Sequence, residues 1–270
     1  MPILAITRET GSLGTFIGEE VARRLGYAFV RHQIEAEAAQ VYEAAEDRLV
    51  ATVESKPGVW ESLSEAARRH FAFLTAEVFD FALKDNVVIL GRWSTLLLRG
   101  VDHALRVRVC APVELRVCRI QERLGAGAAE ARARIDQSDA GIRARIRQFF
   151  EAEWCEPTLY DVVLNTERFS VEAGADLLCA ALARPDRQPT AGSRAALEDA
   201  ALAARVRAAL KAAPETTRLN VQIACRGGRV ELAGTVESAA GREAASRIAQ
   251  AQPGVVAVEN RVAVIQIPMR

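Results

Sequence analysis

The chain alternates short apolar runs with longer segments in which apolar residues recur every three or four positions. Four segments predict strands, because they are continuous or alternating apolar runs that end near turn residues: 3–7, 87–90, 105–110 and 161–165. Helical spacing predicts helices at 16–25, 33–45, 62–83 and 170–182, and a long Arg/Ala-rich region at 114–152 broken near Gly125. Strands that alternate with helices predict an α/β fold, a parallel sheet with helices on both faces.

The pattern changes after residue 183. Residues 184–194 lack periodicity and contain two prolines and a glycine, which predicts a linker. Beyond it the expected order is αββαβ, a small α+β unit with two helices on one side of its sheet: 197–212, 219–225, 229–235, 238–251 and 255–265. We therefore expect domains at 1–183 and 195–267, joined by the linker.

Composition narrows the class of protein. Among 270 residues, 35 Lys and Arg balance 35 Asp and Glu, which argues against a globally basic nucleic-acid binder. Five cysteines form no CxxC pair and three histidines form no zinc-binding spacing, so we expect reduced thiols and no metal centre of that kind. No apolar run approaches a membrane span and no signal peptide is evident, which predicts a soluble, cytoplasmic protein.

A glycine loop follows the first predicted strand and precedes the first helix. In Gly11-Ser12-Leu13-Gly14-Thr15, successive backbone N–H groups would face outward at the positive end of a helix, where a phosphate supplies the missing acceptors. Arg8 could add a bidentate contact, and Thr15 a hydroxyl for phosphate or Mg²⁺. The alternative is an ordinary tight turn. The full GxxxxGK[ST] pattern is not met, since Thr15 takes the lysine position and Phe16 the Ser/Thr position.

Two further features offer positive charge. Gly91-Arg92 ends a predicted strand at the same sheet edge, so Arg92 could contact an anion, or its side chain could simply be solvated. The long helical region carries many arginines, which suit a mobile lid over a transferring phosphoryl group or a salt-bridged surface helix. These are Arg116, Arg119, Arg123, Arg132, Arg134, Arg143, Arg145 and Arg147.

Three segments in order resemble the cytidylate kinase-like family over about residues 1–183: 6–14 (Ile-Thr-Arg-Glu-Thr-Gly-Ser-Leu-Gly), 88–92 (Val-Ile-Leu-Gly-Arg) and 160–166 (Tyr-Asp-Val-Val-Leu-Asn-Thr). The resemblance implies a P-loop-type sheet, ATP with Mg²⁺ at the glycine loop, a nucleoside monophosphate site involving Arg92, and an arginine lid near 119–147. The chain departs from the family pattern where Thr15 replaces the loop lysine and Trp93 replaces an aspartate. It also has Arg31 in place of an acidic residue and Ile142 in place of an arginine.

The C-terminal unit resembles a BON domain over about 197–265. Its matching segments are 206–210 (Val-Arg-Ala-Ala-Leu), 228–236 (Gly-Arg-Val-Glu-Leu-Ala-Gly-Thr-Val) and 253–260 (Pro-Gly-Val-Val-Ala-Val-Glu-Asn). The resemblance implies binding of phospholipid, another ligand or a protein partner.

Two functions remain open at this point. In the first, the protein transfers the γ-phosphoryl of ATP to a nucleoside monophosphate (CMP-like) or a related small acceptor. Phosphates would be held by Gly11, Ser12 and Gly14 with Arg8 and Thr15, the acceptor by Arg92, and the transition state by Arg119, Arg123, Arg143 or Arg147. In the second, the protein is a catalytically inactive nucleotide-binding or regulatory protein whose BON domain binds phospholipid or a partner.

Overall fold

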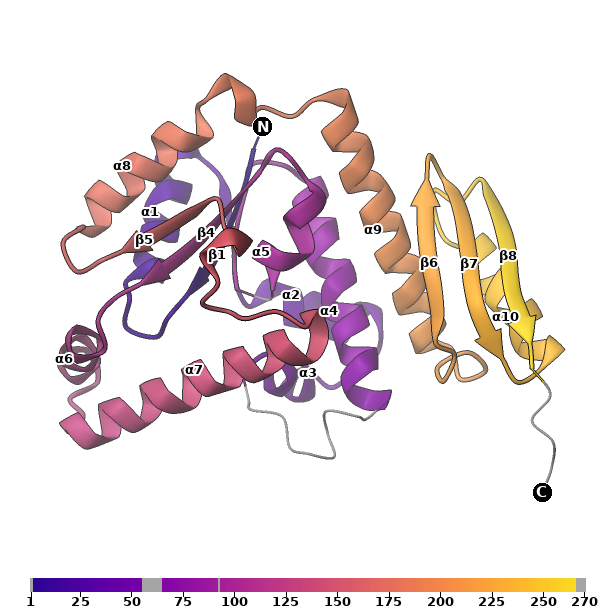
Figure 1. Cartoon of the computed structure of the whole chain (residues 1–270), viewed down its shortest axis with the longest axis horizontal. Coiled ribbons are helices and arrows are strands. Elements are labelled where there is room, and N and C mark those ends of the chain that lie inside the picture. Colours follow the sequence, from indigo (N-terminus) through magenta and orange to yellow (C-terminus); the bar gives the residue numbers. More distant parts are fainter. Residues whose placement is uncertain (1, 55–64, 92, 266–270) are drawn as a thin grey trace.

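The structure, a computed structural model, describes residues 2–54, 65–91 and 93–265. Its larger sheet is parallel throughout, in the order β2-β3-β1-β4-β5. The strands are β1 (Ile3–Arg8), β2 (Ala28–Val30), β3 (Val87–Leu90), β4 (Ala104–Cys110) and β5 (Val162–Asn165). Their carboxyl ends meet at one edge of the sheet, the lower edge in Figure 1, where ligands bind in open parallel sheets.

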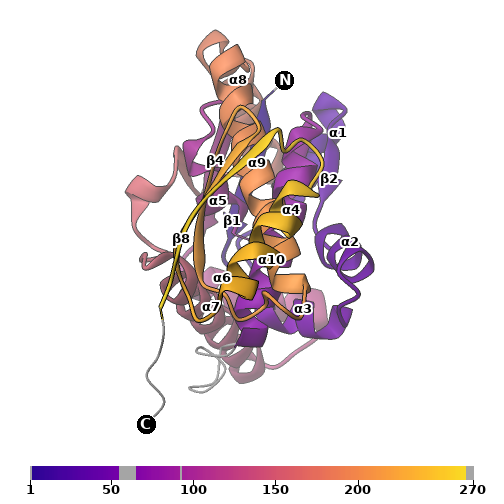
Figure 2. The same cartoon turned by 90° about the vertical axis from the view of Figure 1, so that its right-hand side faces the viewer.

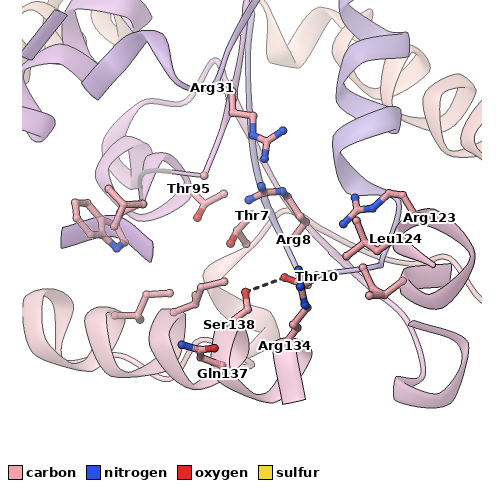
Figure 3. A pocket seen from close by; sticks show the side chains of 16 residues that line it. Thr7, Arg8, Thr10, Arg31, Thr95, Arg123, Leu124, Arg134, Gln137 and Ser138 are labelled. Atoms are coloured by element: carbon pink, nitrogen blue, oxygen red, sulfur yellow. Dashed lines mark hydrogen bonds between the residues drawn. The ribbon is translucent and has the colours of Figure 1, made fainter. Parts of the chain in front are cut away.

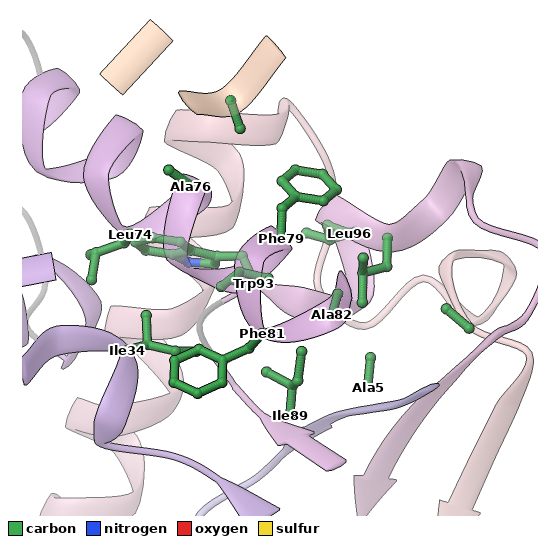
Figure 4. Close-up of a cluster of buried hydrophobic side chains, with 14 of the residues drawn as sticks. Ala5, Ile34, Leu74, Ala76, Phe79, Phe81, Ala82, Ile89, Trp93 and Leu96 are labelled. Atoms are coloured by element: carbon green, nitrogen blue, oxygen red, sulfur yellow. The ribbon is translucent and has the colours of Figure 1, made fainter. Parts of the chain in front are cut away.

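Helices cover both faces of this sheet. Leu4 and Ile6 of β1 pack with α1 (Gly14–Leu25) and α8 (Val171–Leu182). Ile3 and Ala5 face the opposite way, into a core with α2 (Gln33–Val41), α3 (Glu46–Glu54) and α4 (Glu65–Leu83). Figure 4 shows part of that core, with Phe81 of α4 beside Ile34 and Ile89, and Phe79 beside Leu96. Because both faces of the sheet are covered, β1 is apolar at each position from Ile3 to Ile6.

Two long helices pass the carboxyl edge of the sheet. The Arg/Ala-rich region forms α6 (Val113–Leu124) and α7 (Ala128–Phe150), which are separated where Gly125 adopts a φ of 63°. Short helical turns connect other elements: α5 (Ser94–Leu97), η2 (Leu98–Gly100), η3 (Pro157–Leu159) and η4 (Pro185–Arg187). Because α7 runs across the strand ends in Figure 1, it forms a wall of the site described below.

The C-terminal unit has the predicted αββαβ order. Its elements are α9 (Ala191–Ala212), β6 (Val221–Arg226), β7 (Arg229–Val236), α10 (Ala239–Gln250) and β8 (Ala257–Val264), and the three strands form the smaller sheet. β6 and β7 are antiparallel across the Gly227-Gly228 turn, whereas β7 and β8 are parallel. Apolar residues of α9 and α10 pack on one face of this sheet. Figure 2 shows both helices on the same side. The predicted fold class is confirmed for both sheets.

Helix α9 packs on both halves of the chain. Leu197, Ala201 and Ala208 belong to the core around α4, whereas Leu202 and Val206 belong to the core of the small sheet. Ion pairs reinforce the first contact: Arg194–Asp85 at 2.8 Å, Arg205–Asp80 at 3.5 Å and Lys211–Glu65 at 3.2 Å. The helix begins at Ala191, within the segment expected to be a linker, so the two sheets are joined through one shared helix.

Besides the short helical turns, strand β2 and helix α3 were not predicted. Strand β2 has three residues, too few for an apolar pattern to stand out. The predicted helix at 33–45 ends at Val41, near Glu43, whose φ is 49°, and α3 follows as a separate helix. Among the helices that the structure describes, each is too short or too polar to cross a bilayer.

Candidate active site

The glycine loop connects β1 to α1 and turns sharply twice. Gly11 has a φ of 85°, and Leu13 has a left-handed conformation with a φ of 64°. A Cβ at Gly11 would lie 3.0 Å from the Arg116 carbonyl oxygen, and a Cβ at Gly14 only 2.6 Å from the Arg8 Cβ. Neither position has room for a side chain, because Arg116 lies against Gly11 and Arg8 lies against Gly14. These close contacts fix the loop at the start of α1.

The first turn of α1 has unsatisfied polar groups. Its N-cap residue Leu13 provides no side-chain hydrogen bond, and the turn contains no acidic residue. The Ser12 hydroxyl oxygen is buried beside it without a hydrogen-bond partner. Uncapped amides at the positive end of a helix, next to an unpartnered hydroxyl, form a site suited to an anion such as phosphate.

Arg8 extends from the end of β1 across this loop. Its side chain passes over Gly14, and its Nε donates to the Thr15 hydroxyl at 3.2 Å. Its Nη1 also lies near Gly91, 3.5 Å from the position of a Cβ built there. A guanidinium is thus fixed beside the first turn of α1, although Thr15 occupies the position where a P-loop has its lysine.

A buried ion network supports the loop from below. Glu9 accepts from Arg108 Nη2 at 2.6 Å and from the Ala111 backbone N–H at 3.1 Å, and it lies 3.5 Å from Arg116. Arg116 in turn pairs with Asp139 of α7 at 3.0 Å and donates to the Thr10 carbonyl. These bonds fix the loop to β4, α6 and α7. We therefore interpret Glu9 as a structural carboxylate rather than a proton acceptor.

A second brace comes from the end of β5. Arg119 of α6 donates to the Gly11 carbonyl at 3.3 Å, to the Thr166 hydroxyl at 2.9 Å and to the Thr166 carbonyl at 2.7 Å. The Thr166 hydroxyl donates to the Ser12 carbonyl at 2.9 Å. Burial lowers the pKa of Arg119, but an arginine remains charged at neutral pH. The predicted Asn165-Thr166 segment and Arg119 thus meet at the glycine loop.

Two cavities meet above this loop. The glycine-loop cavity has a volume of about 300 Å³ and is lined by Gly11, Leu13, Gly14, Thr15 and Phe16, among others. The adjoining cavity has a volume of about 410 Å³ and lies between the strand ends and α7. The residues that line both are Arg8, Thr10, Arg31, Ile120 and Arg123. A group bound in one cavity would therefore lie next to a group bound in the other.

Positive charge dominates the adjoining cavity. Arg8, Arg31, Arg123 and Arg134 line it, and its other described lining residues include no Asp or Glu. Figure 3 shows Arg8, Arg31 and Arg123 directed toward the same space near Thr10, with Arg134 approaching from α7. The Arg31 Nε is buried without a hydrogen-bond partner. Clustered guanidinium groups with so few carboxylates repel one another, so this cavity favours an anionic ligand.

Helix α7 closes the far side of the adjoining cavity. Ser138 lies 2.8 Å from the Thr10 hydroxyl, oxygen to oxygen, which links α7 directly to the glycine loop. Ile142 and Ile146 add apolar surface to the same wall. Trp93, which follows the end of β3, also lines the cavity and packs against Phe71 and Phe149. The cavity therefore combines cationic side chains with an aromatic and aliphatic wall.

Comparison with known protein families agrees with this geometry. The model of the cytidylate kinase-like family matches residues 3–168, which is more than half of the chain. The chain belongs to the cytidylate kinase-like family. The BON domain model matches residues 198–266, so this family member carries a BON domain after its kinase-like region.

Individual relatives match at low identity. The chain is 29% identical over 109 residues to the cytidylate kinase of Methanopyrus kandleri, covering 37% of this chain and 56% of that protein. It is 28% identical over 113 residues to the cytidylate kinase of Pyrococcus horikoshii, covering 42% and 58%. The chain thus spans less than two thirds of the length of these relatives. A solved structure of an uncharacterized protein from Eubacterium ventriosum matches with a TM-score of 0.55 and 16% identity, covering 68% of this chain and 100% of that one.

The structure places the predicted site residues of this family member in three groups. Gly11, Ser12, Gly14 and Thr15 form the glycine loop, and Arg8, Arg119 and Arg123 surround it. Arg143 and Arg147 lie on the exposed side of α7, where Arg147 pairs with Glu153 at 2.6 Å. Among the residues that the structure describes, neither lines one of the two cavities. The prediction for Arg92 lies outside the described residues.

From the sequence, Arg134 was one of eight arginines in the helical region and Arg31 was a departure from the family pattern, and neither was given a specific role in the site. Arg31 directly follows β2, the strand that was missed, and so stands at the carboxyl edge of the sheet. Arg134, Gln137 and Ser138 share one face of α7 at helical spacing, which is a signal the sequence does contain. It is hidden because arginines occur on two opposite sides of that helix, and the spacing does not say which side faces the site.

The residues at the loop fit nucleotide phosphates better than they fit a protein-held metal. Uncapped amides, the Ser12 hydroxyl and Arg8 offer donors to phosphate oxygens. The Thr15 hydroxyl, by contrast, lies 3.2 Å from a guanidinium nitrogen, a poor neighbour for Mg²⁺. No cluster of three metal-binding side chains occurs within 2–54, 65–91 and 93–265. The predicted Thr15–Mg²⁺ contact therefore stays a prediction, and no step below depends on it.

Proposed function

We propose that this protein binds the phosphates of ATP at the glycine loop and transfers the γ-phosphoryl group to a nucleoside monophosphate of the CMP type in the adjoining cavity. The observation that carries the proposal is the meeting of the two cavities at Arg8, Arg31 and Arg123. Membership of the cytidylate kinase-like family supports it. A donor phosphate and an acceptor phosphate bound on either side of these guanidinium groups would be adjacent, as direct transfer requires.

The proposed transfer exchanges one P–O bond for another. An oxygen of the acceptor phosphate forms a bond to the γ-phosphorus, while the bond from that phosphorus to the β–γ bridging oxygen breaks and ADP leaves. Backbone amides of the loop hold the donor phosphates in place. Arg8 and Arg123, from opposite sides, offset the charge that spreads over the transferring group.

Arg8 supplies the charge that a P-loop lysine would provide. It reaches the first turn of α1 from β1, and Gly14 leaves the space through which it passes. A guanidinium contacts two phosphate oxygens at once and remains protonated, so the change of residue type retains the electrostatic contribution. Phosphoryl transfer depends on positioning and charge, which a side chain from a different chain position can provide.

The acceptor cavity favours a ligand with an anionic group and a flat apolar part. Arg31 and Arg134 would bind a phosphate, while Trp93 and the isoleucines of α7 offer a surface for a base. Arg92 extends this set as a proposed acceptor contact on the family pattern. Helix α7, tied to Thr10 through Ser138, would keep water away from the transferring group.

Binding and turnover can be tested separately. Titration calorimetry with a non-hydrolysable ATP analogue, with and without Mg²⁺, measures donor binding to the full chain. A coupled assay of ADP release then compares CMP, dCMP, UMP, AMP and GMP as acceptors. We expect ATP-analogue binding and acceptor-dependent ADP release, fastest with a pyrimidine nucleotide. Failure to bind the ATP analogue would contradict the proposal.

A second candidate is a nucleotide-binding regulator without turnover. Thr15 favours this candidate, because the commonest phosphate-binding loop has a lysine at that position and this chain does not. ATP-analogue binding without ADP release on any acceptor would support this candidate.

For the BON domain, we propose binding of phospholipid or a protein partner, which co-flotation of the full chain with anionic liposomes tests. ATP as the donor would place the reaction in the cytoplasm.

A further inference from the structure

Strand β8 is a long edge of the small sheet. It is hydrogen-bonded to β7 on one side only, and Figure 1 shows it as the outermost strand. Its residues alternate between two faces: Val262 is buried under the helices, whereas Glu259 and Arg261 lie on the open face. An edge of this length presents unpaired main-chain groups to another strand.

The sequence of this edge is self-complementary. Residues 256–264 read Val-Ala-Val-Glu-Asn-Arg-Val-Ala-Val, which is symmetric about Asn260 apart from Glu259 and Arg261. If two copies of the strand pair in antiparallel fashion about Asn260, every apolar residue meets an identical one, and each Glu259 meets the Arg261 of the other copy. Directly opposed residues in an antiparallel pair share a face, so both ion pairs lie on the open side of the sheet.

Exposed apolar side chains support the same pairing. Val256, Val264 and Ile265 are the large hydrophobic residues of the described small unit with high exposure, at 71%, 39% and 47%. They lie at the two ends of β8. Symmetry about Asn260 places Val256 opposite Val264 of the other copy, and Val255 opposite Ile265. The pairing would therefore cover exposed apolar side chains that the single chain leaves in water.

Main-chain geometry shows which groups are available. The Ile265 N–H donates to the Val236 carbonyl of β7, so odd-numbered residues of β8 direct their main-chain groups inward. Just before the strand begins, the Val256 N–H also bonds inward, to the Gly228 carbonyl at 2.8 Å, so Val256 offers the partner its side chain. The Asn260 carbonyl instead accepts from Arg242 Nη2 at 3.2 Å, and the Val262 N–H donates to the Asn260 side chain at 3.0 Å. Arg242 is exposed, whereas the Asn260 side chain also donates to the Arg242 carbonyl at 2.9 Å and to the Ser246 hydroxyl at 2.7 Å. An incoming strand has to replace only the bonds at the Asn260 carbonyl and the Val262 N–H, and the Asn260 amide can stay on α10.

We propose that the chain forms a symmetric dimer through antiparallel pairing of two β8 strands about Asn260, which joins the two small sheets into one of six strands. The interface combines main-chain hydrogen bonds with two Glu259–Arg261 pairs and the apolar ends of the strand. The inference goes beyond the proposed kinase function and does not depend on it.

Charge reversal tests the proposal on the full chain. Sedimentation velocity from about 1 to 100 µM measures the dimer dissociation constant of the wild type, Arg261→Glu, and the double variant Glu259→Arg/Arg261→Glu. Arg261→Glu places like charges opposite each other twice, and we expect dimerisation to weaken about tenfold or more. The double variant restores both opposite-charge pairs and should recover the wild-type constant. Arg242→Ala, which frees the Asn260 carbonyl, should strengthen dimerisation.

Several outcomes would overturn the proposal. One is a wild type that remains monomeric at 100 µM, and another is a dimer that Arg261→Glu leaves unchanged. Within one chain Arg261 already pairs with Glu231 at 2.9 Å and with Glu259 at 2.7 Å, so thermal unfolding of each variant is recorded. If Arg261→Glu unfolds, Glu259→Arg creates the same mismatch with two arginines and takes its place. Loss of dimer in both the single and the double variants would also contradict specific Glu–Arg pairing.

Discussion

The two cavities at the carboxyl edge of the sheet differ in what lines them. The glycine-loop cavity is made mainly of backbone, held by Glu9, Arg116 and Arg119 through buried hydrogen bonds. The adjoining cavity is made of long side chains that come from β1, α6, α7 and the chain after β2. Under the proposed function, the glycine-loop cavity would accept a phosphate of any nucleotide, and selectivity for the acceptor would depend on the side chains of the adjoining cavity.

The largest expected effect, on affinity for the ATP analogue, comes from adding a side chain within the glycine-loop cavity. Gly14→Ala places a Cβ 2.6 Å from the Arg8 Cβ and 3.1 Å from the Val109 Cβ, so the loop or Arg8 must move. We expect affinity for the ATP analogue to fall at least about 100-fold, with a loss of about 1–3 kcal/mol in stability. Gly100→Ala is the matched control, because a Cβ there meets nothing within 4 Å. Equal affinity in both variants would show that the loop does not bind the nucleotide.

Arg8 is one of the three arginines that line both cavities, and it is the one fixed beside the first turn of α1. Removing it in Arg8→Ala takes away a charged contact to the transferring group, and we expect kcat to fall by about 10²–10³-fold. Arg8→Lys should recover part of this loss, since it retains the charge without the bidentate geometry. Steady-state ADP release measures both variants. A kcat for Arg8→Ala within a factor of about three of wild type would contradict the role assigned to this residue.

A comparison along α7 separates the cavity wall from the solvent face. Both Arg134 and Arg147 are exposed and paired, with Glu130 at 2.8 Å and Glu153 at 2.6 Å, but of the two only Arg134 lines the adjoining cavity. Arg134→Ala should raise the KM for the acceptor about tenfold and leave the KM for ATP unchanged. Arg147→Ala should change both values less than about twofold. The reverse pattern would restore Arg147 as the lid residue that the sequence suggested.

The smallest effect on kcat is expected from Glu77, which lies outside both cavities. Burial, together with Asp80 and Glu37, raises the pKa of Glu77 in α4 to about 7. The folded state then holds a proton that the unfolded state releases near 4.5, so the free energy of unfolding falls as pH rises from about 5 to 7. Glu77→Gln should flatten this part of the pH profile of chemical denaturation, while kcat at pH 7 stays unchanged. A profile identical to wild type would contradict the raised pKa.

The backbone part of the site was predictable from sequence, and most of the side-chain part was not. Gly11 and Gly14 stand between a clear strand and a clear helix, so the loop could be placed by local pattern alone. Arg31 reaches the site only because β2 joins the sheet next to β3, a pairing of residues far apart in the chain. A strand of three residues carries too little pattern to predict that contact.

The arginines of α7 show a different limit. Helical spacing groups them by face, but it does not say which face meets the sheet. The choice depends on tertiary contacts, chiefly Asp139 with Arg116 and Ser138 with Thr10. Helix α9 has a similar ambiguity, because two apolar stripes pack against two different cores. One periodic pattern could not indicate both partners.

The proposed function depends above all on the loop between β1 and α1, which together with Arg8 would bind the phosphates of ATP. The most direct measurement is a crystal structure of the full chain with a non-hydrolysable ATP analogue. We expect terminal phosphates within hydrogen-bond distance of the first-turn amides of α1, with the Arg8 guanidinium contacting a phosphate oxygen. An analogue bound elsewhere, or a loop whose amides are closed by a protein side chain at saturating analogue, would contradict it.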